Sequence, residues 1–213
     1  MAFFPLFVNL QDKEVLVVGA DQPLSYQLST LKMFGAHITI IAPSVNEEIT
    51  QLAKDSGGQI ELKIQDISPS DVYSIDIKPL VVIAASSNLE LNATVYEYYH
   101  EQNIAVEDLS DLERCDFLFP AVVKKEDVVC AVSSGGKSSH VAHFVKGVVE
   151  GAVPENIGAI NARMEEMREI VKLSIPDAAK RSEALRSVFN KLLEDDNQTE
   201  DSELDMLIAQ FGG

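Results

Sequence analysis

The stretch Glu14-Val-Leu-Val-Val-Gly19 decides the fold. It is a short apolar run that ends in glycine, a pattern typical of a buried parallel strand that enters a tight turn. Apolar residues at spacings of three and four follow in residues 22–34 and predict a helix, which ends before Gly35. A second apolar run, His37-Ile-Thr-Ile-Ile-Ala42, predicts another strand. The order strand, helix, strand defines a βαβ unit with two parallel strands.

The same alternation of strands and helices continues to about residue 110. Continuous apolar runs indicate strands that are buried on both faces, as in a parallel sheet covered by helices. We therefore expect an α/β protein with a Rossmann-like, doubly wound parallel sheet. The further elements expected there are a helix at 45–55, strands at 59–64 and 80–85, a helix at 88–101 and a short strand at 103–106.

Past the fifth strand the pattern changes. Two apolar runs, 117–123 and 127–133, are separated by a few polar residues and predict a hairpin of strands. The loop Ser133-Ser-Gly-Gly-Lys-Ser-Ser139 leads into a helix, and the rest of the chain is predicted to be helical. Breaks are expected near Pro176 and in the acidic run 194–203, which is interpreted as a solvated linker or a polar helical face.

The composition excludes several classes of protein. Of the 213 residues, 46% are hydrophobic and 24% are charged, which is enough apolar material for a packed core and excludes wholesale disorder. The 17 basic residues face 34 acidic ones, a net charge of -17, so we expect no nucleic-acid partner. No apolar run is long enough to span a membrane, and the N-terminal residues lack the basic region of a signal peptide. We expect a cytoplasmic protein without a membrane partner.

The turn at Gly19 lies where a dinucleotide fold receives a pyrophosphate, because backbone N–H groups and a helix N-terminus point at one spot. The fingerprint G-x-G-x-x-G/A would require glycine at position 21 and a small residue at position 24. This chain has Asp21 and Leu24 instead, so a side chain and a negative charge replace the glycine. Taken alone, the motif leaves NAD binding open, and Pro43 after the second strand indicates no preference between NAD and NADP.

Two polar segments follow apolar strands. Ser86-Ser-Asn88 comes after the fourth predicted strand and could contact a ribose, but helix capping is the safer interpretation. Ser133-Ser-Gly-Gly-Lys137 could bind an anion through glycine N–H groups and the lysine charge. It lacks the spacing of a Walker A loop, so triphosphate hydrolysis is not expected.

The acidic residues Glu107, Asp108, Asp111, Glu113 and Asp116 follow the fifth predicted strand. Carboxylates in a loop are usually solvated, whereas one in a cleft at a sheet edge could be a general base. Both alternatives stay open from the residues alone.

No resident metal site is expected. His140 and His143 are three apart on one predicted helix, but no carboxylate motif completes a set of ligands. Cys115 and Cys130 fit neither a disulfide framework nor a paired zinc-ligand spacing, so they are interpreted as small buried hydrophobic residues.

Several segments in unbroken order carry a resemblance to one family. The most specific of them are Cys115-Asp-Phe-Leu-Phe-Pro-Ala121 and Ala131-Val-Ser-Ser-Gly-Gly-Lys-Ser138. Together the segments resemble the precorrin-2 dehydrogenases, which include the dehydrogenase/ferrochelatase part of sirohaem synthases. The other matching segments are Phe4-Pro-Leu-Phe-Val-Asn-Leu10, Val15-Leu-Val-Val-Gly19, Gly35-Ala36, Thr39-Ile-Ile-Ala-Pro43 and Val82-Ile-Ala-Ala85.

This resemblance implies an enzyme of sirohaem or cobalamin synthesis that oxidises precorrin-2, a tetrapyrrole, to sirohydrochlorin with NAD. Some members of the family also insert a metal, so Fe2+ or Co2+ would be a substrate. The family's architecture implies an intertwined homodimer. On this basis we expect a Rossmann-like dinucleotide-binding domain at 1–112, a dimerisation segment at 113–152 and a C-terminal helical domain at 153–213.

The resemblance also assigns site residues. Val106-Glu107-Asp108 matches the family's Val-Val-Asp motif, which makes Asp108 the expected catalytic base, with Asp111 as the reserve candidate. Nearby basic residues would offset the repulsion between an acidic protein and a polycarboxylate substrate. Those basic residues are Arg114, Lys124, Lys125, Lys137 and Lys146. The expected cofactor-binding residues are Gly19, Ala20, Asp21, Gln22, Pro23, Pro43, Ser44, Ala85 and Ser86, and the expected substrate-binding residues are Ser134, Gly135 and Lys137.

One departure from the family keeps other functions open. The family usually reads Gly-Gly-Gly-x-Val-Ala-x-Arg-Lys where this chain reads Gly19-Ala-Asp-Gln-Pro-Leu-Ser-Tyr-Gln27. The tetrapyrrole segment is well kept, whereas the pyrophosphate glycines and the basic pair are missing. The alternatives are a chelatase that does not use NAD and a non-catalytic tetrapyrrole-binding protein.

Overall fold

The computed structural model describes residues 3–212, so Met1 and Ala2 of the N-terminal stretch considered above lie outside it. The chain divides into two units. The first unit consists of Met1–Pro120 with Ser133–Ser139, and the second consists of Ala121–Val132 with His140–Gly213. The three-part division at 112 and 152 stays a prediction.

The first unit contains the expected parallel sheet, in the order β3-β2-β1-β4-β5. All four neighbouring pairs of strands are parallel. The predicted α/β class with a Rossmann-like sheet is therefore confirmed. The strands are β1 (Glu14–Val18), β2 (His37–Ala42), β3 (Ile60–Ile64), β4 (Val81–Ala84) and β5 (Ala105–Asp108).

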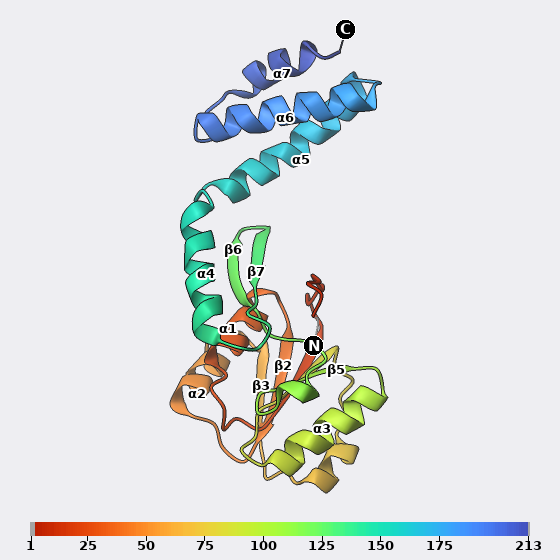
Figure 1. The fold of residues 1–213 in the computed structure, drawn as a ribbon, viewed down its shortest axis with the longest axis vertical. Helices are drawn as coiled ribbons and strands as arrows, with labels where there is room; N and C mark the ends of the chain where they lie inside the picture. Colours follow the sequence, from red (N-terminus) through yellow and green to blue (C-terminus); the bar gives the residue numbers. More distant parts are fainter. Residues whose placement is uncertain (1–2, 213) are drawn as a thin grey trace. The chain divides into compact units, whose positions relative to one another are not determined.

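Helices cover both faces of this sheet (Figure 1). Apolar residues of α1 and α2 pack with β1 and β2 in one buried cluster. Residues of α3 and of the 3-10 helix η1 pack with β1 and β4 in a second cluster on the other face. These helices are α1 (Ser25–Met33), α2 (Glu47–Lys54), η1 (Pro69–Ser74) and α3 (Leu89–Glu101).

Strand β5 begins two residues later than the sequence pattern indicates. Asn103 has a positive φ of 60°, and the backbone N–H of Ile104 donates to the Tyr99 carbonyl, so both residues belong to the turn after α3. The pairing of Ala84 with Asp108 then places Glu107 and Asp108 inside the strand. The expectation that these two carboxylates follow the strand is wrong, because sheet register rather than local apolarity sets the strand's end.

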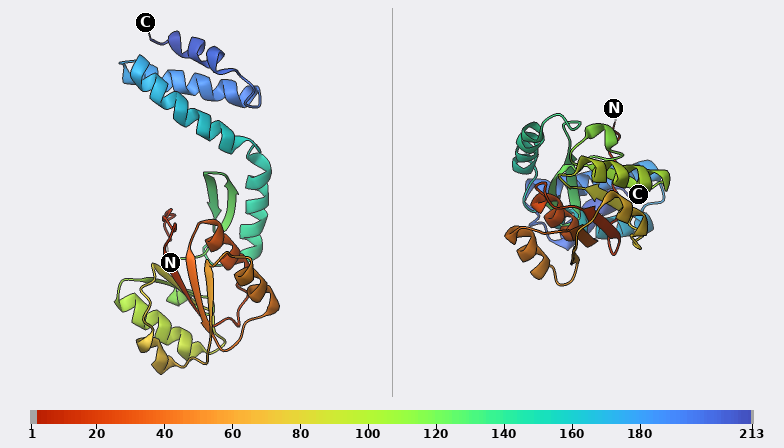
Figure 2. Two further views of the ribbon diagram at one scale, coloured as in Figure 1. Left: turned by 180° about the vertical axis from the view of Figure 1, so that it is seen from behind. Right: turned by 90° about the horizontal axis from the view of Figure 1, so that it is seen from below.

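The second unit combines the predicted hairpin with helices. The strands β6 (Ala121–Lys125) and β7 (Val128–Val132) are antiparallel and joined at Glu126, which has a positive φ of 53°. Three C-terminal helices bury their own apolar cluster and lie side by side in Figure 2. No helix among residues 3–212 is long and apolar enough to cross a membrane. The helices of this unit are α4 (Ser139–Ala152, whose first residue belongs to the first unit), α5 (Ile157–Ser174), α6 (Ala178–Glu194) and α7 (Asp201–Ala209).

Candidate active site

The strand order identifies the ligand-binding edge of the sheet. The chain runs outward from β1 through β2 to β3, and β4 then pairs on the other side of β1. In open α/β sheets, ligands bind beyond the carboxyl ends of the strands at such a switch point. The loops that follow β1 and β4 flank this crevice.

These two loops touch closely at Gly19. Its φ is +84°, which favours glycine, and its N–H donates to the Ile41 carbonyl at 2.8 Å. A Cβ atom at Gly19 would lie 2.5 Å from the backbone nitrogen of Ser86. The glycine therefore permits the close approach of the two loops. Its position directly after a strand predicts such a tight turn.

The Asp21 carboxylate crosses the crevice. Its Oδ2 accepts a hydrogen bond from the backbone N–H of Ser87 at 2.7 Å and one from the Ser86 hydroxyl at 3.4 Å. These donors, Ser87 above all, hold the pKa of Asp21 below its usual range, so the carboxylate carries its charge at neutral pH. We call these contacts the Asp21 bridge.

The backbone amides of the same turn are also engaged. The N–H groups of Asp21 and Gln22 both donate to the Ala85 carbonyl, at 3.1 and 3.3 Å, and Pro23 has no N–H. A pyrophosphate needs free donors here, and it would meet the negative charge of Asp21 as well. In this arrangement, the amides of Asp21 and Gln22 are not free to bind the pyrophosphate of NAD(P).

A cavity of about 460 Å3 opens beside this turn. It contains four of the predicted cofactor residues and two carboxylates, and none of its lining residues is basic. Gly19, Ala85 and Ser86 are buried at the base of the two loops, whereas Pro43 and Ser44 are exposed after β2 and do not line the cavity. The lining residues are Ala20, Asp21, Gln22, Pro23, Ser25, Tyr26, Asn46 and Glu48.

Asp108, the expected base, is the last residue of β5 at the same edge of the sheet. Its side chain is 0% exposed. Oδ1 accepts hydrogen bonds from the Ser110 N–H at 2.8 Å and the Ser110 hydroxyl at 2.6 Å. Oδ2 has no hydrogen-bond partner among the described residues, and the Arg114 guanidinium lies 3.7 Å away. Asp108 thus holds one saturated oxygen and one that can still accept a proton.

Asn92 of α3 joins this carboxylate to the crevice. The residue is 0% exposed, and its Oδ1 accepts the Ser86 N–H at 3.1 Å. Its Nδ2 donates to the Ser86 carbonyl at 3.0 Å, the Ser110 hydroxyl at 3.1 Å and Asp108 Oδ1 at 3.4 Å. Asn92 is not among the site residues predicted from the sequence. The available signal was an amide among the apolar positions of a helix, between Leu91 and Val95.

The remaining carboxylates of the acidic segment have separate roles. Asp111 caps the 3-10 helix η2 (Leu112–Arg114) by accepting the Glu113 N–H at 3.0 Å, and its side chain is 39% exposed. Asp116 accepts the Val106 N–H at 3.0 Å. Glu107 is buried and accepts the Phe119 N–H at 2.7 Å, and burial raises its pKa to about 7. Asp108, at the carboxyl end of β5, stays the predicted base, with Asp111 as the reserve candidate.

The predicted substrate loop lies in the same unit as Asp108. Ser134 accepts the Ser138 N–H at 3.0 Å, and Gly135 and Gly136 have positive φ angles of 68° and 75°. A Cβ atom at Gly136 would lie 2.5 Å from Cδ1 of Leu112, so the loop packs directly on η2. The structure therefore brings Ser134, Gly135 and the exposed Lys137 close to the segment that carries Asp111 and Arg114.

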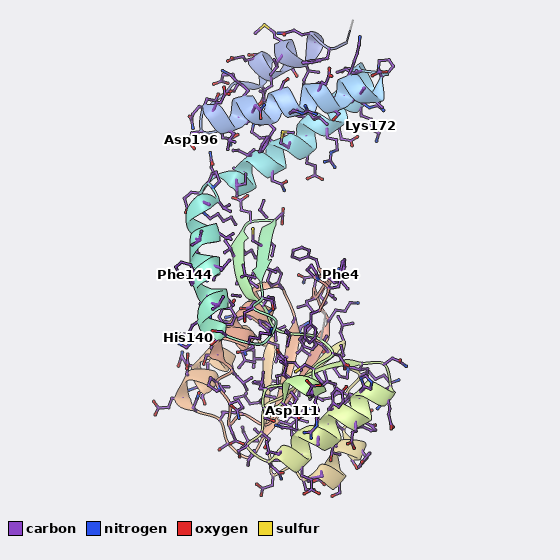
Figure 3. All side chains as sticks on the ribbon, in the orientation of Figure 1. Phe4, Asp111, His140, Phe144, Lys172 and Asp196 are labelled. Carbon is purple, nitrogen blue, oxygen red and sulfur yellow. The ribbon has the colours of Figure 1, made fainter. Side chains whose placement is uncertain are left out.

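The remaining residues considered as metal ligands are the two histidines of α4 and the two cysteines. Among the described residues, no group of three or more His, Cys, Asp or Glu side chains is arranged to hold a metal ion. His140, labelled in Figure 3, lies in the first turn of α4. Both cysteines are free thiols, and burial raises the pKa of Cys115 to about 11, in keeping with a small buried hydrophobic residue.

Comparisons with known proteins identify the family. The model of a family described as putative NAD(P)-binding matches residues 6–121. Siroheme synthase 1 of Pectobacterium atrosepticum is 29% identical over 172 residues, covering 81% of this chain and 35% of that protein. A siroheme synthase of Psychrobacter cryohalolentis is 32% identical over 189 residues, covering 89% of this chain and 35% of that protein. The chain spans about a third of the length of these curated relatives.

A solved structure, SirC, precorrin-2 dehydrogenase, has the same fold with a TM-score of 0.67 at 18% identity, and the match covers 98% of both chains. These findings confirm the resemblance noted in the sequence. The chain belongs to the family described as putative NAD(P)-binding.

Proposed function

We propose that this protein is an oxidoreductase that converts precorrin-2 to sirohydrochlorin in siroheme and cobalamin synthesis. The observation that carries the proposal is the hydrogen bonding of the Asp108 carboxylate at the carboxyl end of β5. Ser110 and Asn92 fix the orientation of its carboxylate, and Oδ2 has no hydrogen-bond partner among the described residues. Family membership supports the same reaction.

The reaction removes a hydride and a proton from the substrate. NAD(P), when bound, supplies the hydride acceptor. The proton is the part that this chain's residues perform, and Asp108 Oδ2 accepts it. The Arg114 side chain is 35% exposed and its guanidinium lies 3.7 Å from the buried Oδ2. In this proposal, movement of Arg114 opens the path to the base. Arg114 also compensates the buried negative charge.

The carboxylates of the tetrapyrrole would bind at the loop that packs on η2. Gly135 and Lys137 are exposed there, and Arg114 adds a second positive charge. Ser134, Gly135 and Lys137 bind the substrate in this proposal. We further propose a cytoplasmic homodimer. The exposed apolar side chains Phe144 and Val148 on α4 support a partner surface, as does Phe4 near the N-terminus (Figure 3).

A second candidate function is metal insertion into sirohydrochlorin without NAD, with Fe2+ or Co2+ as substrate. The Asp21 bridge favours it, because the bridge holds a carboxylate in the turn where this fold receives a pyrophosphate. Asp108 would then accept protons from the pyrrole nitrogens.

An anaerobic absorbance assay of precorrin-2 with the purified protein, with and without NAD+, tests the proposal. We expect NAD-dependent formation of sirohydrochlorin. No conversion at saturating NAD+, together with consumption of sirohydrochlorin when Fe2+ is added, would replace the dehydrogenase with the chelatase. Binding of sirohydrochlorin with neither conversion would indicate a tetrapyrrole-binding protein.

A further inference from the structure

We propose that the Asp21 carboxylate is an internal competitor of the cofactor: it fills the pyrophosphate position of the crevice, so that a dinucleotide binds only after the Asp21 bridge has opened. This inference rests on the proposed function only in assuming that NAD(P) is the ligand of the crevice. It makes Asp21 the residue that sets the affinity for that cofactor.

The position of the bridge places it across the ligand-binding crevice. Asp21 belongs to the loop after β1, and Ser86 and Ser87 belong to the loop after β4. Because β1 and β4 meet at the switch point of the sheet, a bond between these loops spans the crevice that a dinucleotide must cross. The bridge closes the crevice at the place where the fold normally opens it.

The donors of the bridge have the chemistry of an anion site. A phosphate is recognised by backbone N–H groups and hydroxyls, and Ser87 and Ser86 provide one of each. Both donate to the Asp21 carboxylate, which is itself an anion with two acceptor oxygens. The two donors thus form an anion site, and the anion that occupies it is the side chain of Asp21 itself.

Two further amides of the turn are already engaged. The Asp21 and Gln22 amides bond to the Ala85 carbonyl, and Pro23 has none. Glu48 adds a second carboxylate to the adjoining cavity, whose lining has no basic residue. A pyrophosphate therefore has to displace Asp21 and tolerate its charge at the same time.

The experiment compares the affinity of the full chain for NADH among the wild type, Asp21→Asn and Asp21→Ala, measured by the fluorescence of the nicotinamide. Asn removes the charge but keeps an oxygen for the Ser87 N–H, whereas Ala removes both the charge and the bridge. We expect Asp21→Ala to bind NADH about 10- to 100-fold more tightly than the wild type, as loss of one charge-assisted hydrogen bond implies. Asp21→Asn should lie between the two.

Two controls test whether the effect is specific to Asp21 and to the pyrophosphate. Asp76→Asn removes an exposed carboxylate before β4, at the opposite edge of the sheet, and should leave NADH affinity unchanged. ADP-ribose and adenosine then separate the parts of the cofactor. Asp21→Ala should gain affinity for ADP-ribose, which carries the pyrophosphate, and none for adenosine, which does not.

Equal NADH affinity in the wild type and Asp21→Ala, including no binding to either, would overturn the inference. So would an equal gain for adenosine and ADP-ribose, because the pyrophosphate would then not be the group that Asp21 opposes. Conversion of precorrin-2 separates this result from the proposed function. A wild type that turns over with the same KM for NAD+ as Asp21→Ala keeps the function and refutes the competitor.

Discussion

Two aspartates at the same edge of the sheet, Asp21 after β1 and Asp108 at the end of β5, differ in what surrounds them. Asp21 is exposed and bonds to donors of the neighbouring loop, which links two segments that a ligand would separate. Asp108 is buried and bonds to side chains that orient it, while one of its oxygens has no hydrogen-bond partner among the described residues. The difference teaches that the hydrogen-bond partners of a carboxylate determine whether it obstructs a ligand site or is available to react in it.

The largest effect is expected at the β5 carboxylate. Asp108→Asn keeps the size of the side chain and an oxygen for Ser110 but cannot accept the substrate's proton. We expect the rate of precorrin-2 conversion to fall about 10²- to 10⁴-fold with little change in KM. Circular dichroism and the thermal unfolding midpoint should show that the fold is kept. A loss below tenfold would move the role of base to Asp111.

The neighbouring carboxyl group, Glu107, makes the stability of the protein depend on pH. Its pKa is raised from 4.5 to about 7 in the folded state, because burial disfavours the charged form. The stability that its neutral form contributes is complete below about 4.5 and is lost as the pH rises through about 7. At about 1.4 kcal/mol per pH unit, the loss amounts to about 3 kcal/mol.

Glu107→Gln removes this titration while an amide oxygen still accepts the Phe119 N–H. We expect the variant to be about 3 kcal/mol more stable than the wild type at pH 8 and similar to it at pH 4.5. Urea unfolding followed by circular dichroism measures the difference. Glu97→Gln on the exposed face of α3 serves as the control, and it should show no such pH dependence. A constant difference between the two pH values would contradict the buried titration.

Asn92 joins the two regions, so its removal tests whether they depend on each other. Asn92→Ala leaves the buried N–H of Ser86 without its acceptor, and we expect a loss of stability of about 2 kcal/mol. If Asn92 also positions Asp108, the conversion rate and its pH profile change in both variants. The change should be larger in Asn92→Asp, which keeps an acceptor for Ser86 but places a second carboxylate beside Asp108. Equal kinetics in the wild type and both variants would limit Asn92 to a structural role.

The smallest effect is expected at the exposed carboxylate of η2. Asp111→Asn keeps the oxygen that accepts the Glu113 N–H, so the cap survives and stability should change by less than about 0.5 kcal/mol. Conversion of precorrin-2 should stay within about threefold of the wild type, because the proposed mechanism transfers the substrate's proton to Asp108. A loss as large as that of Asp108→Asn would show that the two carboxylates exchange roles.

The local patterns of the sequence were enough to predict most elements. The apolar runs of β1, β2 and β4 match the predicted strands to within about one residue at each end, because each run is buried on both faces of the sheet. Asn88 also caps α3, as its position before the helix predicted, by accepting the Glu90 and Leu91 N–H groups. The β5 boundary was misplaced, because pairing with β4 rather than local apolarity sets it.

The candidate site could be predicted only in part. Asp108 and the crevice after β1 followed from the resemblance and from the fold class. Asn92 did not, because nothing in its neighbourhood along the chain indicates contacts with Ser86 and Asp108, which lie on other elements. Asn92 and Asp108 are 16 positions apart in the sequence, and the parallel pairing of β4 with β5 brings them together.

The sequence by itself determined the fold class, the family and the loss of glycine at position 21, because these depend on residue type and spacing along the chain. Only the tertiary structure decided what Asp21 and Asp108 do with their charges. Asp21 could have pointed to solvent, and Asp108 could have stayed in a loop. Their partners come from neighbouring strands and loops, and such contacts exist only once the sheet has fixed its register.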